Sequence, residues 1–332
     1  MGFWTSYRLR LKRKRLQLRA LHKRRELTVQ QDRTGQIKPG DILLFCACRN
    51  EAVRLPYFLQ YYRDLGVHHF FFVDNDSDDD GAAYLSQQPD VSLWTTGAPY
   101  GQSRYGMDWL THLQAKYAHD HWALTVDVDE FFVYPFCDTR PIAALADWLD
   151  ASEVRSFGAM LLDMYPKGRV SAPLYRAGEN PFSVLNWFDP GNYIITRNPL
   201  YQNLWIQGGP RARAFFANKP KQAPALNKIP FVKWQRGYAY VSSTHMVLPR
   251  GLNLVYDQSG GEKTSGILLH AKFTNAFGQR APEEARRGEH YDAAREYKFY
   301  DPNIDLWCEW SEQYINWRQL DELGLMSKGN WA

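Results

Sequence analysis

Two aspartates separated by one residue, Asp127 and Asp129, have the side-chain type and the spacing to share a divalent cation. They belong to the string Thr125-Val-Asp-Val-Asp-Glu-Phe131, which follows an apolar run of strand length, 122–126. Carboxylate oxygens are the ligands that Mg²⁺ and Mn²⁺ prefer, and such ions keep open positions for substrate phosphates. An acidic triplet alone is common on exposed loops. Its position at the end of a predicted buried strand favours a metal site.

A second acidic cluster, residues 74–81, follows the predicted strand 69–73. From Asp76 onwards it matches the first half of an EF-hand loop, but Gln87 stands where a bidentate glutamate belongs, and a strand precedes the loop in place of a helix. We therefore expect a nucleotide-binding loop, in which Asp74 and Asn75 reach the base or the ribose.

The elements that must position these residues alternate along the chain. Apolar runs predict strands at 41–48, 69–73, 91–95 and 122–126, and helical spacing predicts helices at 51–65, from about 82, and at 107–119. This alternation predicts an α/β fold with a mostly parallel central sheet flanked by helices. Parallel sheets bind ligands at the carboxyl ends of their strands, which is where the polar clusters fall.

We expect one large domain. Residues 1–40 would form a basic arm and a connector, residues 41–135 the half of the domain that holds both acidic clusters, and residues 136–300 the other half. Residues 301–332 would form a C-terminal helix with an aromatic stripe that packs on the core, made by Trp307, Trp310, Tyr314, Trp317 and Leu320.

Basic residues gather at the N-terminus. Residues 1–25 carry a local charge of +10 without an acid, in a chain whose net charge is +4. Five leucines are interleaved with these cations, which favours a helix lying on an anionic membrane surface; binding to nucleic acid and a solvated tail are the alternatives. We favour the membrane contact and expect no nucleic acid. The leucines are Leu9, Leu11, Leu16, Leu18 and Leu21.

The sequence points to a cytoplasmic protein, held at most peripherally on the inner face of the cell membrane. No apolar stretch reaches the roughly 18 to 20 residues that span a bilayer, and no signal-peptide pattern opens the chain. Cys46 and Cys48 lie two apart in a predicted buried strand, which suits a reducing compartment better than a disulfide framework.

Several segments, in the same order along the chain, resemble the bacterial glycosyltransferase family 2-like group, whose members have the GT-A fold. The segments are Cys48-Arg-Asn-Glu-Ala52, residues 59–66, residues 70–77, residues 122–131, Thr244-His245-Met246 and Gly266-Ile-Leu-Leu-His-Ala-Lys-Phe273. The resemblance covers about 45–300, and it implies that residues 41–135 form a nucleotide-sugar-binding half and residues 136–300 an acceptor-binding half. It is fairly specific for the family and not for a sugar.

The resemblance implies a role for each matching residue. Asp129 would bind Mn²⁺ or Mg²⁺ directly, Asp127 would face the metal or the ribose, and His270 would complete the metal site, with His245 in reserve. Lys272 could neutralise a phosphate. A nucleotide pocket would be lined by Arg49, Asn50, Glu51, Asp74 and Asn75.

An inverting displacement, which the resemblance suggests, needs a base to take the proton of the acceptor hydroxyl. Family 2 enzymes often carry acids some distance beyond the DxD box, yet residues 191–256 contain no Asp or Glu. The candidates for the base are therefore Asp163, Asp189 and Glu289, with a preference for Asp189 because of its flanking aromatic residues.

The acid-free stretch holds nine cations. Its densest part, Gly208-Gly-Pro-Arg-Ala-Arg213, predicts a flexible turn on which Arg211 and Arg213 could grip a phosphate or a uronate. A solvated basic face is the alternative. An anionic partner would be the donor diphosphate, a lipid-linked acceptor or an acidic glycan.

Taken together, the sequence predicts a metal-dependent glycosyltransferase that uses a nucleotide sugar, with a UDP-sugar favoured, in cell-surface or extracellular polysaccharide synthesis. Two alternatives stay open. One is a nucleotidyltransferase with the same acidic metal site, although Cys48-Arg-Asn-Glu-Ala52 lacks the glycines of a phosphate loop. The other is a non-catalytic module that binds calcium or nucleic acid.

Overall fold

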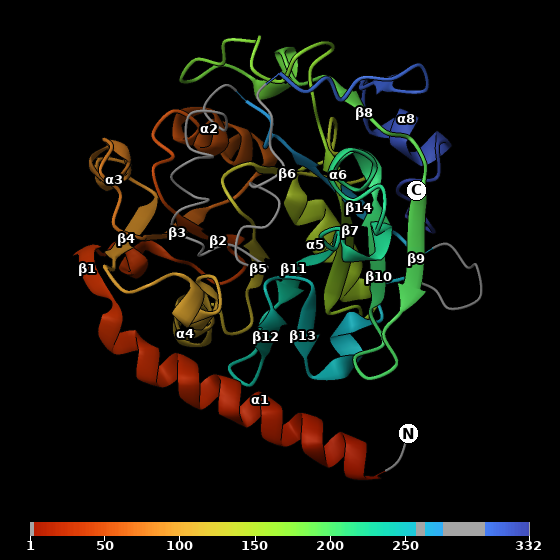
Figure 1. Ribbon diagram of the computed structural model, residues 1–332. Helices are drawn as coiled ribbons and strands as arrows, with labels where there is room; N and C mark the ends of the chain where they lie inside the picture. Colours follow the sequence, from red (N-terminus) through yellow and green to blue (C-terminus); the bar gives the residue numbers. More distant parts are fainter. Residues whose placement is uncertain (1–2, 257–262, 275–302, 332) are drawn as a thin grey trace.

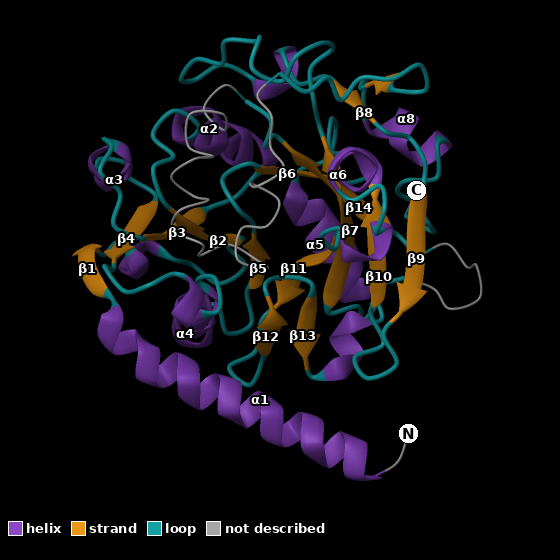
Figure 2. Cartoon of the chain, in the orientation of Figure 1, coloured by secondary structure: helices purple, strands orange, loops and turns teal. Residues whose placement is uncertain are grey.

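A computed structural model describes residues 3–256, 263–274 and 303–331. A nine-stranded sheet lies at its centre, with helices on both faces (Figure 1 and Figure 2). In their order across the sheet the strands are β1 (Thr28–Gln31), β4 (Val91–Thr95), β3 (His69–Asp74), β2 (Leu43–Cys48), β5 (Trp122–Thr125), β11 (Asn227–Lys233), β7 (Ser156–Asp163), β14 (Gly266–His270) and β6 (Glu130–Val133).

Six of these strands, β4, β3, β2, β5, β7 and β14, run in one direction, while β1, β11 and β6 run in the other. The prediction of an α/β domain with a mostly parallel sheet flanked by helices is confirmed. The predicted strands correspond to β2, β3, β4 and β5. The antiparallel insertion of β11 between β5 and β7 was not predicted.

Alternating side chains of the strands form two cores, one on each face of the sheet. Leu44 and Cys46 of β2 face α2 (Leu55–Leu65) and α5 (Ile142–Ala151). Leu43 and Phe45 face α4 (Met107–Tyr117) together with the hairpin of β12 (Ala239–Ser242) and β13 (Met246–Leu248). Helix α3 (Gly81–Ser86) follows β3.

The N-terminal segment is part of the folded domain. Helix α1 (Phe3–Lys23) packs along α4 and β12, where it buries Leu9, Leu16 and Ala20 (Figure 1). Arg19 Nε lies 2.6 Å from Asp108 Oδ2 at the start of α4. Strand β1 then joins the edge of the sheet beside β4. The helix is therefore held on the body along one face and is no detached arm.

The second half of the described chain continues the same sheet through β7, β11 and β14. No helix in the described part of the chain has the length and apolar character to cross a membrane. The smaller elements are β8 (Trp187–Phe188), β9 (Tyr193–Arg197), β10 (Leu204–Gly208), α6 (Gly209–Phe215), β15 (Glu312–Gln313) and α8 (Trp317–Glu322).

The expected long helix at 301–332 is corrected to a turn, a short strand and a short helix. Ser311 N donates to Cys308 O (2.9 Å) to close the turn, and β15 pairs with β8. The Asn316 side chain then caps α8 by accepting from the N–H of Arg318. Trp310, which the stripe would have buried, is 62% exposed.

Strand β14 is packed so closely at Gly266 that one added methyl group should destabilise the protein. A Cβ at Gly266 would lie 2.6 Å from Val133 O and 3.0 Å from the Phe157 ring. Since the backbone cannot give way cheaply, Gly266→Ala should lower the free energy of unfolding by about 1–3 kcal/mol. Denaturant unfolding measures this change. Gly35→Ala, where no atom lies within 4 Å, is the control and should change it by less than about 0.5 kcal/mol; equal losses would contradict the packing described here.

Candidate active site

The loop at residues 126–129 carries the paired aspartates across the carboxyl edge of the sheet. It leaves β5 and enters β6, and β11, β7 and β14 lie between these two strands, so the loop passes the ends of β7 and β14. Glu130 N donates to Asp127 O (3.0 Å), and Ala271 N donates to Asp129 O (2.7 Å). The first bond closes a turn within the loop, and the second ties the loop to the residue that follows His270.

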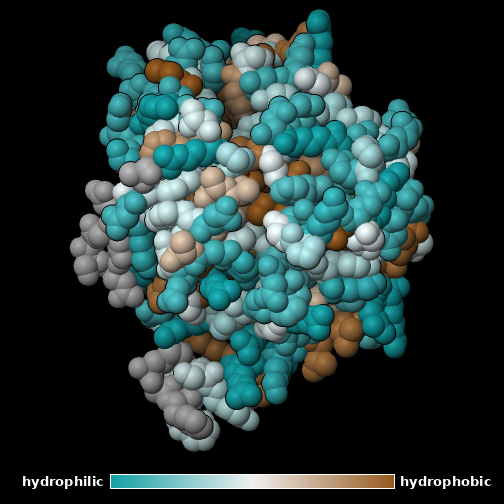
Figure 3. Space-filling model, turned by 180° about the vertical axis from the view of Figure 1, so that it is seen from behind, coloured by the Kyte–Doolittle hydropathy of each residue, from teal (hydrophilic) through white to brown (hydrophobic). Residues whose placement is uncertain are grey.

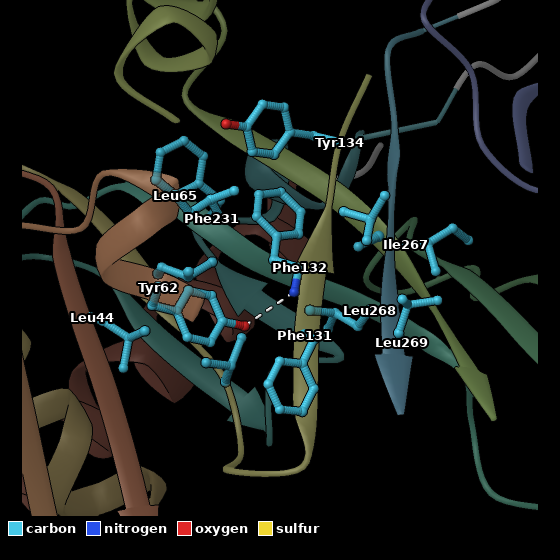
Figure 4. Packing of buried hydrophobic residues seen from close by; sticks show 14 of the residues in the cluster. Leu44, Tyr62, Leu65, Phe131, Phe132, Tyr134, Phe231, Ile267, Leu268 and Leu269 are labelled. Carbon is cyan, nitrogen blue, oxygen red and sulfur yellow. Dashed lines mark hydrogen bonds between the residues drawn. The ribbon is translucent and has the colours of Figure 1, made fainter. Parts of the chain in front are cut away.

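Helix α2 holds the outer edge of β6 through two tyrosines. The Tyr62 hydroxyl donates to the Glu130 carbonyl (2.7 Å) and accepts from the N–H of Phe132 (3.1 Å; Figure 4). The Tyr61 hydroxyl donates to the Phe132 carbonyl (2.7 Å). Burial raises the pKa of both hydroxyls, so they remain donors. The edge strand that begins at Glu130 is thereby covered and fixed.

His270 lies between two carboxylates at the end of β14. Its Nδ1 is 2.6 Å from Asp163 Oδ1, and its Nε2 is 3.3 Å from Asp129 Oδ2. The parallel pairing of β14 with β7 places His270 opposite Asp163. Burial acts to lower the pKa of the imidazole, but the Asp129 and Asp163 carboxylates outweigh it and raise the pKa to about 9.

Asp163 is 2% exposed and also accepts from Arg211 Nε (2.7 Å). Burial acts to raise its pKa, but Arg211 and His270 together lower it to about 2. Burial likewise opposes ionisation of Asp129, and His270 in particular outweighs it and lowers that pKa. Arg211, Asp163, His270 and Asp129 therefore form a row of alternating charges, which we call the ionic row.

The donor set of the ionic row fits a divalent cation. Two ligands in neighbouring positions around an ion, each about 2.1 Å from it, are about 3 Å apart, and Asp129 Oδ2 and His270 Nε2 are 3.3 Å apart. Metal-binding histidines usually donate their second ring N–H to a carboxylate or a carbonyl group, and His270 Nδ1 makes such a bond to Asp163. Among the described residues, no group of three or more His, Cys, Asp and Glu is gathered closely enough to hold a metal. Asp129 and His270 are thus the two described side chains that would bind such an ion, and a substrate or water could supply further ligands.

Asp127, the third predicted ligand, turns towards a different partner. Its Oδ2 lies 4.0 Å from Lys228 Nζ, and its side chain is 48% exposed. Partial burial and the neighbouring Glu130 carboxylate raise the pKa of Asp127, although Lys228 acts in the opposite direction. The structure thus brings Asp129 and His270 together and leaves Asp127 at the rim of the site.

Sequence reasoning missed Lys228 as a site residue. Strand β11 runs antiparallel to β5 and β7, so its first residues lie at the carboxyl edge. Lys228 is 5% exposed, and its Nζ lies 2.8 Å from Glu130 Oε1. A lysine within the apolar strand sequence Asn227–Lys233 was the available signal, because a buried lysine needs a carboxylate partner.

Arg54 is the second missed residue. It is buried, with Nη1 2.7 Å from Glu51 Oε2 and Nη2 3.0 Å from Thr274 Oγ1. Glu51, predicted to line a nucleotide pocket, therefore belongs to a link between the loop after β2 and the segment after His270. Lys272 lies in that segment, and its charge contributes to the lowered pKa of Asp129.

The other predicted nucleotide-binding side chains stabilise the loops after β2 and β3. Asp74 accepts from the N–H and the hydroxyl of Ser77. The Asn75 amide donates to Thr96 O (3.0 Å) and Ala98 O (2.9 Å). Asn50 Oδ1 accepts from the N–H of Asp78 (2.9 Å). Arg49 Nη1 lies 3.8 Å from Asp76 Oδ2.

A cavity of about 700 Å³ adjoins these loops, between β1 and the carboxyl ends of β3 and β4. Polar residues dominate its lining, among them Thr28, Gln30, Asp76 and Thr96. Its volume is within the range of small-molecule sites.

The predicted bases have partners of their own. Asp163 belongs to the ionic row. Asp189 is 2% exposed and accepts from Arg213, with Nη2 at 3.1 Å, and from the Tyr165 hydroxyl. Glu289 lies outside the described residues. Which residue acts as the base stays a prediction.

The two predicted phosphate-binding arginines lie on α6, in place of the expected flexible turn. Gly208 and Gly209 have φ values of +153° and +66°, which allow the chain to turn sharply from β10 into the helix. Arg211 and Arg213 then point to Asp163 and Asp189.

His245, the reserve metal ligand, makes backbone contacts: its Nδ1 lies 2.6 Å from Asn227 O. Burial, and after it Lys228, lowers its pKa to about 3. This neutral imidazole is bonded to the start of β11 and belongs to no carboxylate pair in the described residues.

The buried pair of Lys228 and Glu130 allows a stability test. Lys228→Met would leave the Glu130 carboxylate, 2% exposed, without its partner, and should lower the free energy of unfolding by about 3–5 kcal/mol. Lys233→Met on the same strand breaks a more exposed pair with Asp150 and should cost at most about 1 kcal/mol. Denaturant unfolding compares the two. Adding Glu130→Gln to Lys228→Met should recover most of the loss; equal costs for both lysines would contradict the buried pair.

Comparisons with known proteins show a limited similarity between this chain and one curated protein. No protein-family model matches the chain. A glycosyltransferase family 92 protein of Ricinus communis is 28% identical over 106 residues, a match that covers 30% of this chain and only 18% of that protein. It supports a glycosyltransferase at the level of reaction class and does not single out family 2.

Two solved structures align weakly. Glucosyl-3-phosphoglycerate synthase from Mycobacterium tuberculosis, crystallised with Mn²⁺, UDP and phosphoglyceric acid, has 14% identity and a TM-score of 0.23 over 42% of this chain and 50% of its own. A protein assigned as a glucose-1-phosphate thymidylyltransferase, from Bacillus anthracis, has 10% identity and a TM-score of 0.28 over 78% and 82%.

Proposed function

We propose that the protein is a metal-dependent glycosyltransferase that moves a sugar from a nucleotide-sugar donor, with a UDP-sugar as the favoured donor, to a hydroxyl of a glycan or lipid-linked acceptor. One observation carries the proposal: His270 is held by Asp163 with its Nε2 facing Asp129 at the carboxyl edge of the sheet. The similarity to a glycosyltransferase family 92 protein supports the reaction class.

Asp129 and His270 are the residues that would hold Mn²⁺ or Mg²⁺, and such an ion would offset the negative charge that develops on the leaving diphosphate. Asp163 is a positioning residue, because it orients the His270 ring and is itself kept ionised by Arg211. Lys228 neutralises Glu130 beside Asp127, which lets several carboxylates coexist at one edge.

The donor would approach from the open side of Asp127, whose side chain is the most exposed of the group. Lys272, whose charge contributes to the lowered pKa of Asp129, would pair with a phosphate oxygen of the donor. The loops after β2 and β3 and the adjoining cavity are the proposed place of the nucleoside. Asp74 lines this cavity, and Arg49, Asn50 and Asn75 belong to the adjoining loops.

The acceptor reaction is proposed as a single displacement with inversion. Asp163 and Asp189 are each engaged with an arginine, so either would act as a base only after that contact opens. Glu289 is the third candidate. A role in cell-surface or extracellular polysaccharide synthesis rests on the family 2 resemblance, and helix α1 gives a separate basis for a membrane contact.

A thermal-shift experiment tests the proposal. UDP with Mn²⁺ should raise the melting temperature, whereas either one alone should have little effect, because the ion and the diphosphate complete each other's coordination. At a ligand concentration 100 times Kd the gain is about 2.7 kcal/mol. Asp129→Asn should abolish the joint shift. The control Asp147→Asn changes an exposed carboxylate on α5 and should leave the shift intact.

Two results would overturn the proposal. One is the absence of any shift with every nucleotide and metal tested. The other is an unchanged joint shift in Asp129→Asn. The released product then distinguishes a glycosyltransferase from a nucleotidyltransferase. A glycosyltransferase releases a nucleoside diphosphate from a nucleotide sugar. A nucleotidyltransferase releases inorganic pyrophosphate when it joins a nucleoside triphosphate to a sugar phosphate.

A further inference from the structure

Helix α1 has two apolar faces, and only one of them is used by the fold. Leu9, Leu16 and Ala20 are at most 8% exposed and pack on the domain. On the opposite side of the helix, large apolar side chains face away from the body. These are Trp4, Tyr7, Leu11, Leu18 and Leu21, which are 74%, 48%, 40%, 66% and 48% exposed.

The outward residues recur at spacings of three, four and seven, so they line one stripe along the helix, which we call the outer stripe. Soluble surfaces seldom expose so many large apolar groups on one element. Figure 3 shows hydrophobic residues among hydrophilic ones at the lower margin of the molecule, the margin along which α1 runs in Figure 1.

Cations border the outer stripe on both sides. Exposed basic side chains include Arg8, Arg10, Lys14, Arg15 and Arg25, and no acid occurs before Glu26. The cations on the inner side are used differently: Arg19 bonds Asp108, and Lys12 bonds the Tyr201 hydroxyl. The charge of the outward side is therefore directed at something other than the domain.

We propose that the outer stripe of α1 docks on an anionic lipid bilayer, with the helix lying parallel to the membrane surface. Apolar side chains that enter the headgroup region and cations that meet anionic headgroups are the two attractions that bind such helices. A second copy of the chain fits less well, because pairing two outer stripes would bring two rows of cations together.

Docking would also orient the enzyme, because α1 is fixed to the body. Its Arg19 bonds the start of α4, and the adjoining Gly106 packs on Ala47 near the carboxyl end of β2. The carboxyl edge of the sheet, with the candidate site, is thus attached to the docked helix through α4. The docking itself does not depend on the proposed transferase activity.

Vesicle co-sedimentation of the full chain tests the proposal. The wild-type protein should bind vesicles of phosphatidylcholine with phosphatidylglycerol and not phosphatidylcholine alone, with weaker binding at high salt. The triple variant Leu11→Ser, Leu18→Ser, Leu21→Ser should bind at least about ten-fold more weakly. The matched control Leu174→Ser, Ile195→Ser, Ile315→Ser removes side chains that are 69%, 58% and 72% exposed elsewhere and should bind like the wild type.

Melting temperatures of both triple variants close to that of the wild-type protein would show that neither variant is unfolded. The proposal is overturned if the wild-type protein ignores anionic vesicles or if the outer-stripe variant binds them as well as the control does. It is also overturned if the wild type is a dimer that the outer-stripe variant converts to a monomer without any lipid binding. If UDP with Mn²⁺ raises the melting temperature of both triple variants by the same amount, the transferase proposal stands even where the docking proposal fails. The two failures can therefore be told apart.

Discussion

The charge pairing of His270 with two carboxylates, the buried Asp163 and the half-buried Asp129, is the interaction on which the rest of the site depends. An unpaired Asp163 carboxylate would be costly, since a charge is unstable away from water without a partner. The ionic row solves this by alternating signs from Arg211 through Asp163 and His270 to Asp129. It joins α6, β7, β14 and the 126–129 loop, which are far apart in the sequence. The contacts that fix these elements therefore also fix the direction in which Nε2 points.

A second group of charges lies beside the ionic row, and the two together are close to neutral. Asp127, Asp129, Glu130 and Asp163 supply four carboxylates, and the described cations around them include Lys228, Arg211 and the His270 imidazolium. A divalent ion that binds His270 must displace the Nε2 proton whether or not a nucleotide is present, but an ion that arrives with a diphosphate also brings its own counter-charge to this balanced site. This balance is the physical reason to expect the metal and the nucleotide to bind together.

The sequence predicted the local parts of this arrangement. Strands β2 to β5 follow from apolar runs that alternate with helical spacing, and Asp129 and His270 stand out because each follows such a run. Lys228 and Arg54 were missed, since β11 reaches the site from far along the chain and no local pattern gives its neighbours. The pairing of Asp163 with Arg211, and of Asp189 with Arg213, is equally non-local. The prediction of a long C-terminal helix was wrong, because aromatic residues at helical spacing also occur in a series of turns that packs on a core.

The coordination of Mn²⁺ by His270 tests the central claim most directly. Pulsed electron paramagnetic resonance of the Mn²⁺ and UDP complex detects the modulation from a directly bound imidazole nitrogen. The account predicts this modulation in the wild-type protein, its loss in His270→Gln and its persistence in His245→Gln, whose ring is bonded to the backbone at Asn227. Modulation that survives in His270→Gln and vanishes in His245→Gln would contradict the account, as would bound Mn²⁺ without any nitrogen ligand.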